Sequence, residues 1–305
     1  MSSSIAIKRV MVTGAFGNLG QKIMSGLAEQ PWCERIIAVD RNINMSDIPE
    51  ALKSKIVAVK QDLTEASLDW WTDELAADVV IHLAAANPLP DSDWEDCVSS
   101  YAMTTRLLEG SALRKVRRFI FASSNHAMGG YKDSPLADSL APGGLDSAKP
   151  AAPGTNWFDG REVIYSRAYG TSKTLGERAC SMVARLTRGE MTCISIRVGW
   201  ALPGDNDPQD ISYSGSPAST ISIDTLSAED KRSLRWFQKM WLSNKDLKNL
   251  FVLASTSSAE HWPSPAVIIN GVSGNDGMVW NLEEAQRFIG YIPADNAADA
   301  IDLTT

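Results

Sequence analysis

The chain up to residue 200 alternates short apolar runs, rich in β-branched residues, with longer stretches of helical spacing. The runs have the length and composition of buried strands and lie at residues 9–14, 35–40, 55–63, 78–85, 117–124 and 192–200. Strands that alternate with helices in this way form a parallel sheet with helices on both faces. The alternation therefore predicts an α/β fold, a Rossmann-like doubly wound parallel sheet, over residues 1–200.

Residues 201–305 are expected to form mainly a small substrate-binding lobe, with some segments returning to the main domain. They contain helical spacing at 229–255, a strand-like run at 265–271 and a last helix near 281–290. Two inserts rich in proline, aspartate and small residues lie at 132–164 and 203–232. Loops of this length are usually functional lids or mobile segments. Open α/β sheets bind ligands at the carboxyl ends of their strands. We therefore expect the ligand-binding cleft to lie between the sheet and the lobe.

The bulk composition excludes several classes of function. The formal net charge of −8 argues against a nucleic-acid or anionic-membrane surface, either of which needs a basic face. The four cysteines form no C-x-x-C pair, so neither a zinc site nor a disulfide framework is expected, and a reducing cytoplasm fits better. The N-terminal segment has no apolar run long enough for a signal peptide or a membrane anchor. We therefore expect a soluble, cytoplasmic protein without a bound metal.

A glycine-rich turn, GAFGNLG, follows the first predicted strand directly, with Gly14, Gly17 and Gly20 spaced three apart. Glycine permits a tight turn and lets backbone N–H groups at a helix N-terminus approach a pyrophosphate. The spacing differs from the commoner G-x-G-x-x-G, and alone it would fit an ordinary strand–turn–helix connection. Its place between the first strand and the first helix predicts dinucleotide binding. The expected contacts are Gly14, Phe16, Gly17, Asn18, Leu19 and Gly20.

Further cofactor contacts are expected at the ends of the next three strands. Asp40 ends the second strand, where its carboxylate would accept from the ribose hydroxyls and repel a 2′-phosphate, which favours NAD over NADP. Arg41 beside it could instead accommodate that phosphate. Asp62, followed by Leu63, could reach the adenine amino group or only stabilise a turn. After the fourth strand, the expected contacts, which could also serve only close packing, are Leu83, Ala84 and Ala85.

The segment YSRAYGTSK places Tyr165, Tyr169 and Lys173 four residues apart, on one helical face. Acid–base chemistry on an alcohol or carbonyl needs a phenol with a lowered pKa, and an ammonium one helical turn away lowers it. Tyr169 is therefore the expected acid/base, whereas Tyr165 is expected to pack or to line the pocket wall. The fifth strand ends in FASSNH, where Ser123 or Ser124 can donate to the substrate oxygen. This order of motifs predicts a complete apparatus for proton and hydride transfer.

Together, GAFGNLG, Asp40, HLAA, SSN and YGTSK resemble an extended short-chain dehydrogenase/reductase of the NAD-dependent epimerase/dehydratase family, over nearly the whole chain. Within it, FASSNHAMGGY, YGTSKTLGE, WLSNKDL and INGVSGNDGMVWNLEEAQRFIGYIPADNA are similar to uronate dehydrogenases, which oxidise the anomeric hydroxyl of glucuronate or galacturonate with NAD. The resemblance implies that Ser124, Tyr169 and Lys173 form the catalytic triad, that Lys173 also binds the nicotinamide ribose, and that Asn125 and His126 contact the substrate.

The chain departs from uronate dehydrogenases at positions that would contact the substrate. Asn87 and Trp200 stand where that family commonly has serines. The arginine that grips the uronate carboxylate would fall on Trp236, with Arg235 one residue away. Together with Trp241, the tryptophans could line a larger or more apolar pocket, or pack the core of the second lobe. The expected substrate-binding set is Asn87, Ser124, Asn125, His126, Trp200 and Arg235.

The resulting prediction is an NAD-dependent dehydrogenase that oxidises a hydroxyl of a sugar, a sugar acid such as a uronate, or a related polyol. An epimerase or dehydratase that retains NAD would use the same residues, and a redox-sensing protein could bind the dinucleotide only as a ligand. The resemblance also suggests a homodimer, because the family often pairs the helix that carries the Y-x-x-x-K segment and the helix before the fifth strand.

Overall fold

The computed structural model describes residues 7–48, 50–65, 67–86, 92–158, 163–213 and 225–303. Its centre is a seven-stranded sheet in the order β3-β2-β1-β4-β5-β8-β9, in which every neighbouring pair is parallel. The strands are β1 (Arg9–Thr13), β2 (Arg35–Asp40), β3 (Ile56–Lys60), β4 (Val79–His82), β5 (Arg118–Ser124), β8 (Thr192–Val198) and β9 (Ala266–Gly271). The predicted Rossmann-like α/β fold is confirmed.

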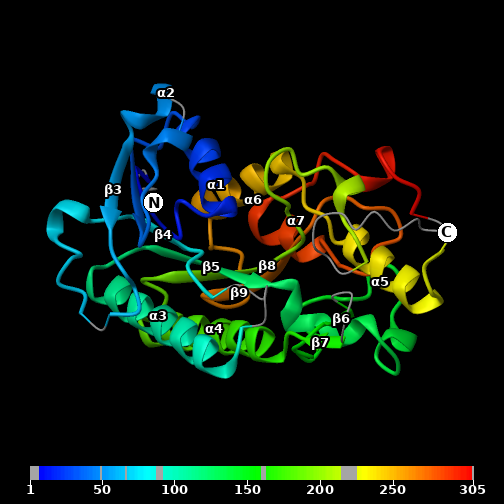
Figure 1. Cartoon of the computed structure of the whole chain (residues 1–305). Coiled ribbons are helices and arrows are strands. Elements are labelled where there is room, and N and C mark those ends of the chain that lie inside the picture. The colour runs from blue at the N-terminus through cyan, green and yellow to red at the C-terminus, as the bar shows by residue number, and fades with distance from the viewer. Residues whose placement is uncertain are drawn as a thin grey trace.

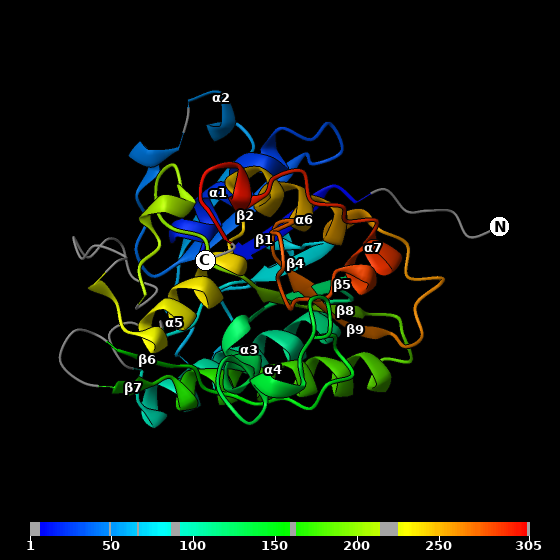
Figure 2. The ribbon, with the colours of Figure 1, turned by 90° about the vertical axis from the view of Figure 1, so that its right-hand side faces the viewer.

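Helices cover both faces of the sheet (Figure 1), and Figure 2 shows the same layers after a quarter turn. One face carries α1 (Asn18–Ala28), α6 (Asn244–Thr256) and α7 (Glu283–Ile289), and the other carries α3 (Trp94–Leu113) and α4 (Arg167–Leu186). The smaller elements are α2 (Glu50–Lys53), α5 (Ala228–Lys239) and the antiparallel hairpin of β6 (Asn156–Phe158) and β7 (Val163–Tyr165). In the described part of the chain, no helix is long and apolar enough to cross a membrane.

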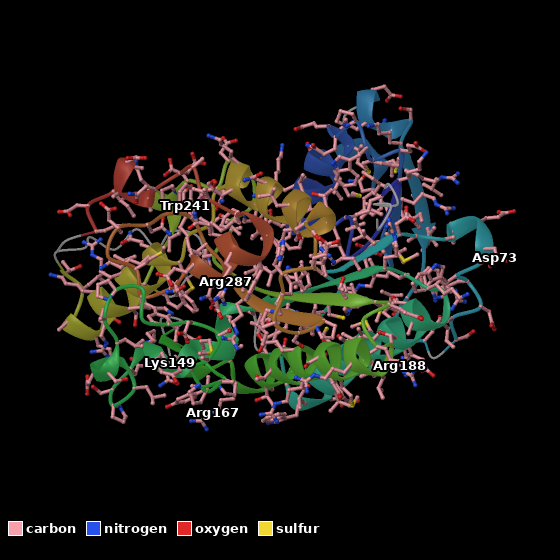
Figure 3. All side chains as sticks on the ribbon, turned by 180° about the vertical axis from the view of Figure 1, so that it is seen from behind. Asp73, Lys149, Arg167, Arg188, Trp241 and Arg287 are labelled. Atoms are coloured by element: carbon pink, nitrogen blue, oxygen red, sulfur yellow. The ribbon has the colours of Figure 1, made fainter. Side chains whose placement is uncertain are left out.

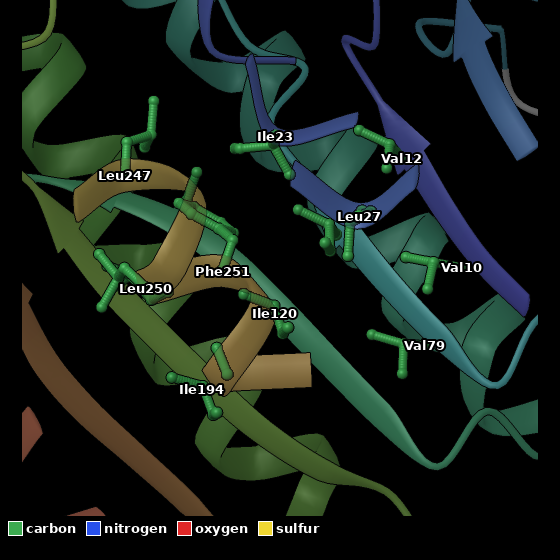
Figure 4. Packing of buried hydrophobic residues seen from close by; sticks show 14 of the residues in the cluster. Val10, Val12, Ile23, Leu27, Val79, Ile120, Ile194, Leu247, Leu250 and Phe251 are labelled. Carbon is green, nitrogen blue, oxygen red and sulfur yellow. The ribbon is translucent and has the colours of Figure 1, made fainter. Parts of the chain in front are cut away.

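Successive residues of each strand face opposite helix layers. Val10 and Val12 pack with α1 and α6, whereas Met11 between them packs with α3 and α4, and all three are fully buried. Side chains alternate along a strand, so burial on both faces requires a nearly continuous apolar run. This is why the strands were recognisable in the sequence. Figure 4 shows one of the two cores, where Ile120 and other strand residues meet α1 and α6.

The helical spacing at 229–255 is divided between two helices. α5 ends at Lys239 and α6 begins at Asn244. In between, Leu242 N donates to Trp200 O, and Trp200 N donates to Met240 O, both at 2.8 Å. Ser243 then starts a new helix, because its hydroxyl accepts from Asp246 N at 3.0 Å and so caps α6. The backbone of 240–242 therefore pairs with the loop after β8 instead of continuing the helix.

The C-terminal region divides between the two parts of the molecule. α6, β9 and α7 join the main domain, with β9 beside β8 and α6 beside α1. α5 and the β6–β7 hairpin lie beyond the ends of β5 and β8 (Figure 1), near η3 (Asn125–Lys132), the 3-10 helix that follows β5. This end has a small core of its own that includes Phe237, Trp241 and Trp280. Seen from behind, Trp241 lies at the opposite end from Asp73 of η2 (Asp73–Leu75) (Figure 3).

Candidate active site

A cavity of about 1020 Å³ lies at the carboxyl ends of the parallel strands, where ligands bind in open α/β sheets. It is lined by every residue expected to contact the cofactor except Lys173, and by Ser124, Asn125, His126 and Trp200 of the expected catalytic and substrate-binding sets. Asn87 lies outside the described residues. One continuous wall thus joins segments from the whole first two thirds of the chain.

The glycine turn forms a narrow cradle at the start of α1. Gly14 has a φ of +67°, and a Cβ added to it would lie 2.9 Å from the backbone nitrogen of Ala84. A Cβ on Gly20 would lie 2.3 Å from Gly14 O. α1 begins after Gly17, and no side chain caps its first turn, so the backbone N–H groups there face an open site suited to an anion. These features fit the pyrophosphate of a dinucleotide.

Asp40 joins this cradle to the end of β2. Its Oδ2 accepts from Phe16 N at 3.0 Å, and its Oδ1 accepts from Asn42 N at 3.2 Å. Each carboxylate oxygen has a second lone pair, so the group can still accept from ribose hydroxyls. Arg41 lines the same part of the cavity, where it could meet a 2′-phosphate.

Asp62 stabilises a local turn, as the structural alternative predicted. Its Oδ1 accepts from Thr64 N at 2.9 Å and from Thr64 Oγ1 at 2.7 Å. These hydrogen bonds, the backbone one first, lower the pKa of the Asp62 carboxyl. The residue also lines the cavity, so its contact with an adenine stays a prediction.

The two serines at the end of β5 point to opposite sides of the sheet, as alternation requires. Ser123 donates to Glu177 Oε1 at 2.6 Å inside the protein. Ser124 lines the cavity, as Tyr169 does, and its Oγ accepts from His126 N at 3.2 Å. Of the two candidates, Ser124 is therefore the one placed to meet a substrate oxygen.

The electrostatics of Tyr169 and Lys173 differ from the prediction. Burial raises the pKa of the Tyr169 phenol to about 12, although the Ser124 hydroxyl opposes this. In the chain by itself, the Lys173 ammonium does not offset the effect of burial on this pKa. The Lys173 Nζ donates to Ala122 O at 2.8 Å and lies 5.3 Å from the centre of the Tyr169 ring, so it faces the ring and not the hydroxyl. Burial lowers the pKa of Lys173 to about 8.

His126 is held as a neutral ring against Tyr169. Burial, and then the charge of Lys173, lower the pKa of His126 to about 4. Its ring meets the Tyr169 ring edge-on at 5.4 Å, and its Nδ1 lies 2.5 Å from Ser166 Oγ. Ser166 Oγ accepts from Thr155 N at 2.9 Å, and its proton can go to His126 Nδ1 or, over a longer distance of 3.4 Å, to Thr155 O. We infer the tautomer from this network: the proton of His126 is on Nε2.

Two buried polar atoms beside the reacting pair have no partner among the described residues. They are His126 Nε2 and Asn125 Oδ1, and both residues line the cavity. The amide nitrogen of Asn125 donates to Val198 O at 3.2 Å, which leaves its oxygen free to accept. Buried polar atoms without partners are rare. A donor and an acceptor beside the cavity are thus left unsatisfied by the described residues.

Arg235 is not among the described residues that line the cavity, so its contact with the substrate stays a prediction. Arg235 lies on α5, and its Nη1 donates to Gln238 Oε1 at 2.8 Å, because residues three apart share a helix face. Trp236 packs against Trp280 at 5.3 Å between ring centres. Trp241 donates through Nε1 to Asn206 O at 2.9 Å and is buried. Neither tryptophan lines the cavity, so both belong to the core of the lobe.

A buried ion pair beneath the site was not predicted from the sequence. Arg197 of β8 donates to both carboxylate oxygens of Glu177 on α4, at 2.8 and 2.9 Å. With the bond from Ser123, this pair joins α4 to β5 and β8 directly below Ser124 and Tyr169. The available signal was an arginine inside the otherwise apolar run TCISIRV, because a buried charge requires a partner.

Further lining residues also escaped prediction. They lie beside strand ends, at the start of α3 and in the loop after β8: Asn42, Gln61, Thr64, Ala86, Ser92, Asp96, Ser99, Ser100, Met103, Gly199, Ala201, Leu202 and Pro203. Their position after strands or at a helix start was the only available signal. Among the residues that the structure describes, no group of three or more His, Cys, Asp or Glu could hold a metal ion.

Comparison with known proteins gives matches over nearly the whole chain. L-arabinose 1-dehydrogenase (NAD(P)(+)) of Haloferax volcanii is 29% identical, over 96% of this chain and 99% of the relative. An NAD-dependent glucose-6-phosphate dehydrogenase of the same organism is 27% identical, over 95% and 94%. A solved structure of a mutated uronate dehydrogenase has a TM-score of 0.65 at 21% identity, covering 98% of this chain and 90% of the other, a likeness in fold.

A family model described as "NAD dependent epimerase/dehydratase family" matches residues 10–199. The matched segment contains the glycine turn, Asp40, Ser124, Tyr169 and Lys173. The resemblance seen in the motifs is therefore confirmed, and the chain belongs to the NAD-dependent epimerase/dehydratase family.

Proposed function

We propose that this protein is an NAD-dependent oxidoreductase that oxidises a hydroxyl group of a sugar, a sugar acid or a related polyol. One observation carries the proposal: a single cavity extends from the glycine cradle to the Ser124–Tyr169 pair. A dinucleotide bound at one end would therefore have its nicotinamide near the other. The two Haloferax relatives, named as sugar and sugar-phosphate dehydrogenases, support the same reaction class.

The residues that would hold NAD follow from the cradle. The first backbone N–H groups of α1 would bind the pyrophosphate, and Asp40 would accept from the adenosine ribose. Ala84 would lie against the cofactor because its backbone already touches Gly14. When bound, NAD supplies the hydride acceptor and a positive charge near Tyr169. Asp40 favours NAD over NADP, whereas Arg41 leaves room for some use of NADP.

The substrate oxygen would lie between the hydroxyls of Ser124 and Tyr169, since both residues line the cavity. Ser124 would donate to this oxygen and orient it. Tyr169 would take its proton, and it must first lose its own proton, because its pKa is about 12 in the chain by itself. The ammonium of Lys173, charged below its pKa of about 8, and the cofactor's positive charge both favour the phenolate. Holding these groups in place supplies much of the rate.

The test follows NADH by its absorbance, with purified protein, NAD and a panel of sugars. The panel contains arabinose, galactose and glucose, the uronates of galactose and glucose, and glucose 6-phosphate. Net NADH formation with any of them supports the proposal. Conversion of a sugar or nucleotide sugar to an epimer without NADH release would replace it with the epimerase alternative. NAD binding without turnover of any substrate would favour a ligand-sensing role.

We also propose a homodimer through the outer faces of α3 and α4. Large apolar side chains there are at least 57% exposed: Trp94, Val98 and Leu113 on α3, and Met182 and Leu186 on α4. Apolar patches of this kind mark protein interfaces, and α3 and α4 pack side by side. Light scattering after gel filtration should give a dimer mass, and Val98→Asp combined with Met182→Asp should give a monomer. A monomeric wild-type protein would refute the proposal.

A cytoplasmic location is proposed on the state of the cysteines. Cys33, Cys97, Cys180 and Cys193 are all free and buried, as suits a reducing compartment. Cell fractionation that finds the protein outside the cytoplasm would overturn this.

A further inference from the structure

Trp200 occupies a distinctive place in the cavity. Among the described lining residues it is the one tryptophan, and it stands directly after β8 with Ser124, Asn125, His126 and Tyr169 around the same space. Its ring centre lies 6.4 Å from that of His126, and the side chain is only partly buried. The indole is therefore available to a ligand at the reacting end of the cavity.

The position of Trp200 is fixed from three sides. Its backbone pairs in both directions with residues 240–242, at 2.8 Å each way. Its ring packs against Phe237 of α5 at 5.3 Å between centres. A Cβ on the preceding Gly199 would lie 2.2 Å from Met240 O, so the chain is pressed closely against its neighbour here. A rigid aromatic surface of this kind binds a ligand with little loss of conformational entropy.

The reacting end of the cavity offers no cation from the described residues. Arg41 is the one lysine or arginine in the described wall, and it lies beside Asp40 at the cofactor cradle. Arg235 hydrogen-bonds Gln238, and the ammonium of Lys173 bonds Ala122 O. Lys132 is buried and bonds Asp133 and Ser233 at 2.9 and 3.1 Å. Against the described residues alone, a substrate carboxylate or phosphate would lose its hydration there without a charged partner, which is unfavourable.

We propose that Trp200 is a specificity-determining residue whose indole stacks on the apolar C–H face of a neutral sugar ring. The electron-rich face of an indole attracts the weakly positive hydrogens of such a face, while the sugar hydroxyls lie beside His126 and Asn125, which line the same cavity. The reacting hydroxyl then lies at Ser124 and Tyr169. This inference rests on the proposed function and narrows its substrate class from sugars in general to uncharged sugars.

The experiment compares matched neutral and charged substrates. KM and kcat are measured from NADH formation with galactose against galacturonate, and with glucose against glucuronate and glucose 6-phosphate. We expect kcat/KM for each charged sugar to be lower than for its neutral counterpart by a factor of about 100. Equal or better use of the charged sugars would overturn the inference, although it would leave the proposed dehydrogenase intact.

Variants at Trp200 test the stacking itself. Trp200→Ala should raise KM for the neutral sugar about tenfold and leave the dissociation constant for NAD unchanged, whereas Trp200→Phe should retain most of the sugar affinity because it keeps an aromatic face. Trp236→Phe is the control, since Trp236 packs in the lobe core away from the cavity. If Trp200→Ala does not fold, Trp200→Leu gives the same comparison with Trp200→Phe at similar volume.

Each outcome separates the two proposals. An unchanged sugar KM in Trp200→Ala, or an equal rise in Trp236→Phe, would show that Trp200 acts only as packing. A parallel loss of NAD affinity would place Trp200 at the cofactor instead. The absence of NADH with every sugar in the wild type would refute the proposed function, and the stacking inference would fail with it.

Discussion

The two ends of the cavity differ in how far backbone and side chains form their walls. At the cofactor end, the wall includes closely packed backbone, because a Cβ on Gly14 or Gly20 would lie against main-chain atoms at Ala84 or in the turn itself. At the reacting end, the wall is mostly side chains, such as His126 and Trp200, carried on segments outside the sheet. A backbone site can be changed only by moving the chain, whereas a side-chain site changes with one substitution. The first suits a cofactor shared by a family, and the second suits substrates that differ among its members.

Replacing Tyr169 should separate chemistry from cofactor binding most clearly. Tyr169→Phe removes the hydroxyl that exchanges the proton, and we expect kcat to fall by about 10²- to 10⁴-fold, with almost no change in the dissociation constant for NAD. Tyr165→Phe is the control, because Tyr165 is half-exposed and its ring lies against Arg167. NADH absorbance and calorimetric titration of NAD give the two values. Near wild-type turnover in folded Tyr169→Phe would contradict the assignment.

The two buried histidines offer a second comparison, through the pH dependence of stability. The pKa of His82 is lowered to about 3 and that of His126 to about 4, in both cases mainly by burial. A histidine in the unfolded chain binds a proton near pH 6.5. Below that pH the unfolded state therefore holds more protons, and the free energy of unfolding falls as pH decreases. We expect protonation of His126 to lower the free energy of unfolding by at most about 3 kcal/mol between pH 6.5 and pH 4.

Urea unfolding at several pH values measures this loss, and His126→Asn should reduce it. His82→Asn should reduce it as well, because His82 is equally enclosed, with Thr13 Oγ1 at 2.8 Å and Thr104 Oγ1 at 3.1 Å. Only His126→Asn should also raise the KM for sugar, since His82 does not line the cavity. Equal effects of the two variants on sugar KM would remove the distinction between a structural and a substrate-facing histidine.

The cofactor end can be tested by a pair of matched glycines. Gly14 and Gly143 both have positive φ, +67° and +70°, but a Cβ on Gly143 would meet nothing within 4 Å. In both alanine variants, backbone strain should lower the free energy of unfolding by about 1 kcal/mol. Only Gly14→Ala should in addition weaken NAD binding, about tenfold or 1.4 kcal/mol. Wild-type NAD affinity in Gly14→Ala, measured by titration together with the melting temperature, would show that the cradle is not the pyrophosphate site.

The same contrast explains what could be predicted from the sequence. The glycine turn, Asp40 and the end of β5 were found because local spacing determines them, and alternation of apolar runs gave the sheet. The direction of the Lys173 ammonium and the position of Arg235 depend on what packs around each helix, which local spacing does not determine. The run at 265–271 was recognised as strand-like, but its place beside β8, with Ala266 opposite Cys193, depends on contacts far apart in the chain.

The packing of α1 against α6 has a consequence for how the protein is made. Ile23 and Leu27 of α1 share one core with Leu247 and Phe251 of α6 (Figure 4). A ribosome adds roughly 5–20 residues per second. The synthesis of α6 therefore follows that of α1 by about 10 to 40 s. During that interval the emerging chain presents the part of α1 that α6 later covers to chaperones and to other nascent chains. A message cut short before Asn244 would leave that face uncovered permanently, which marks such fragments for degradation or aggregation.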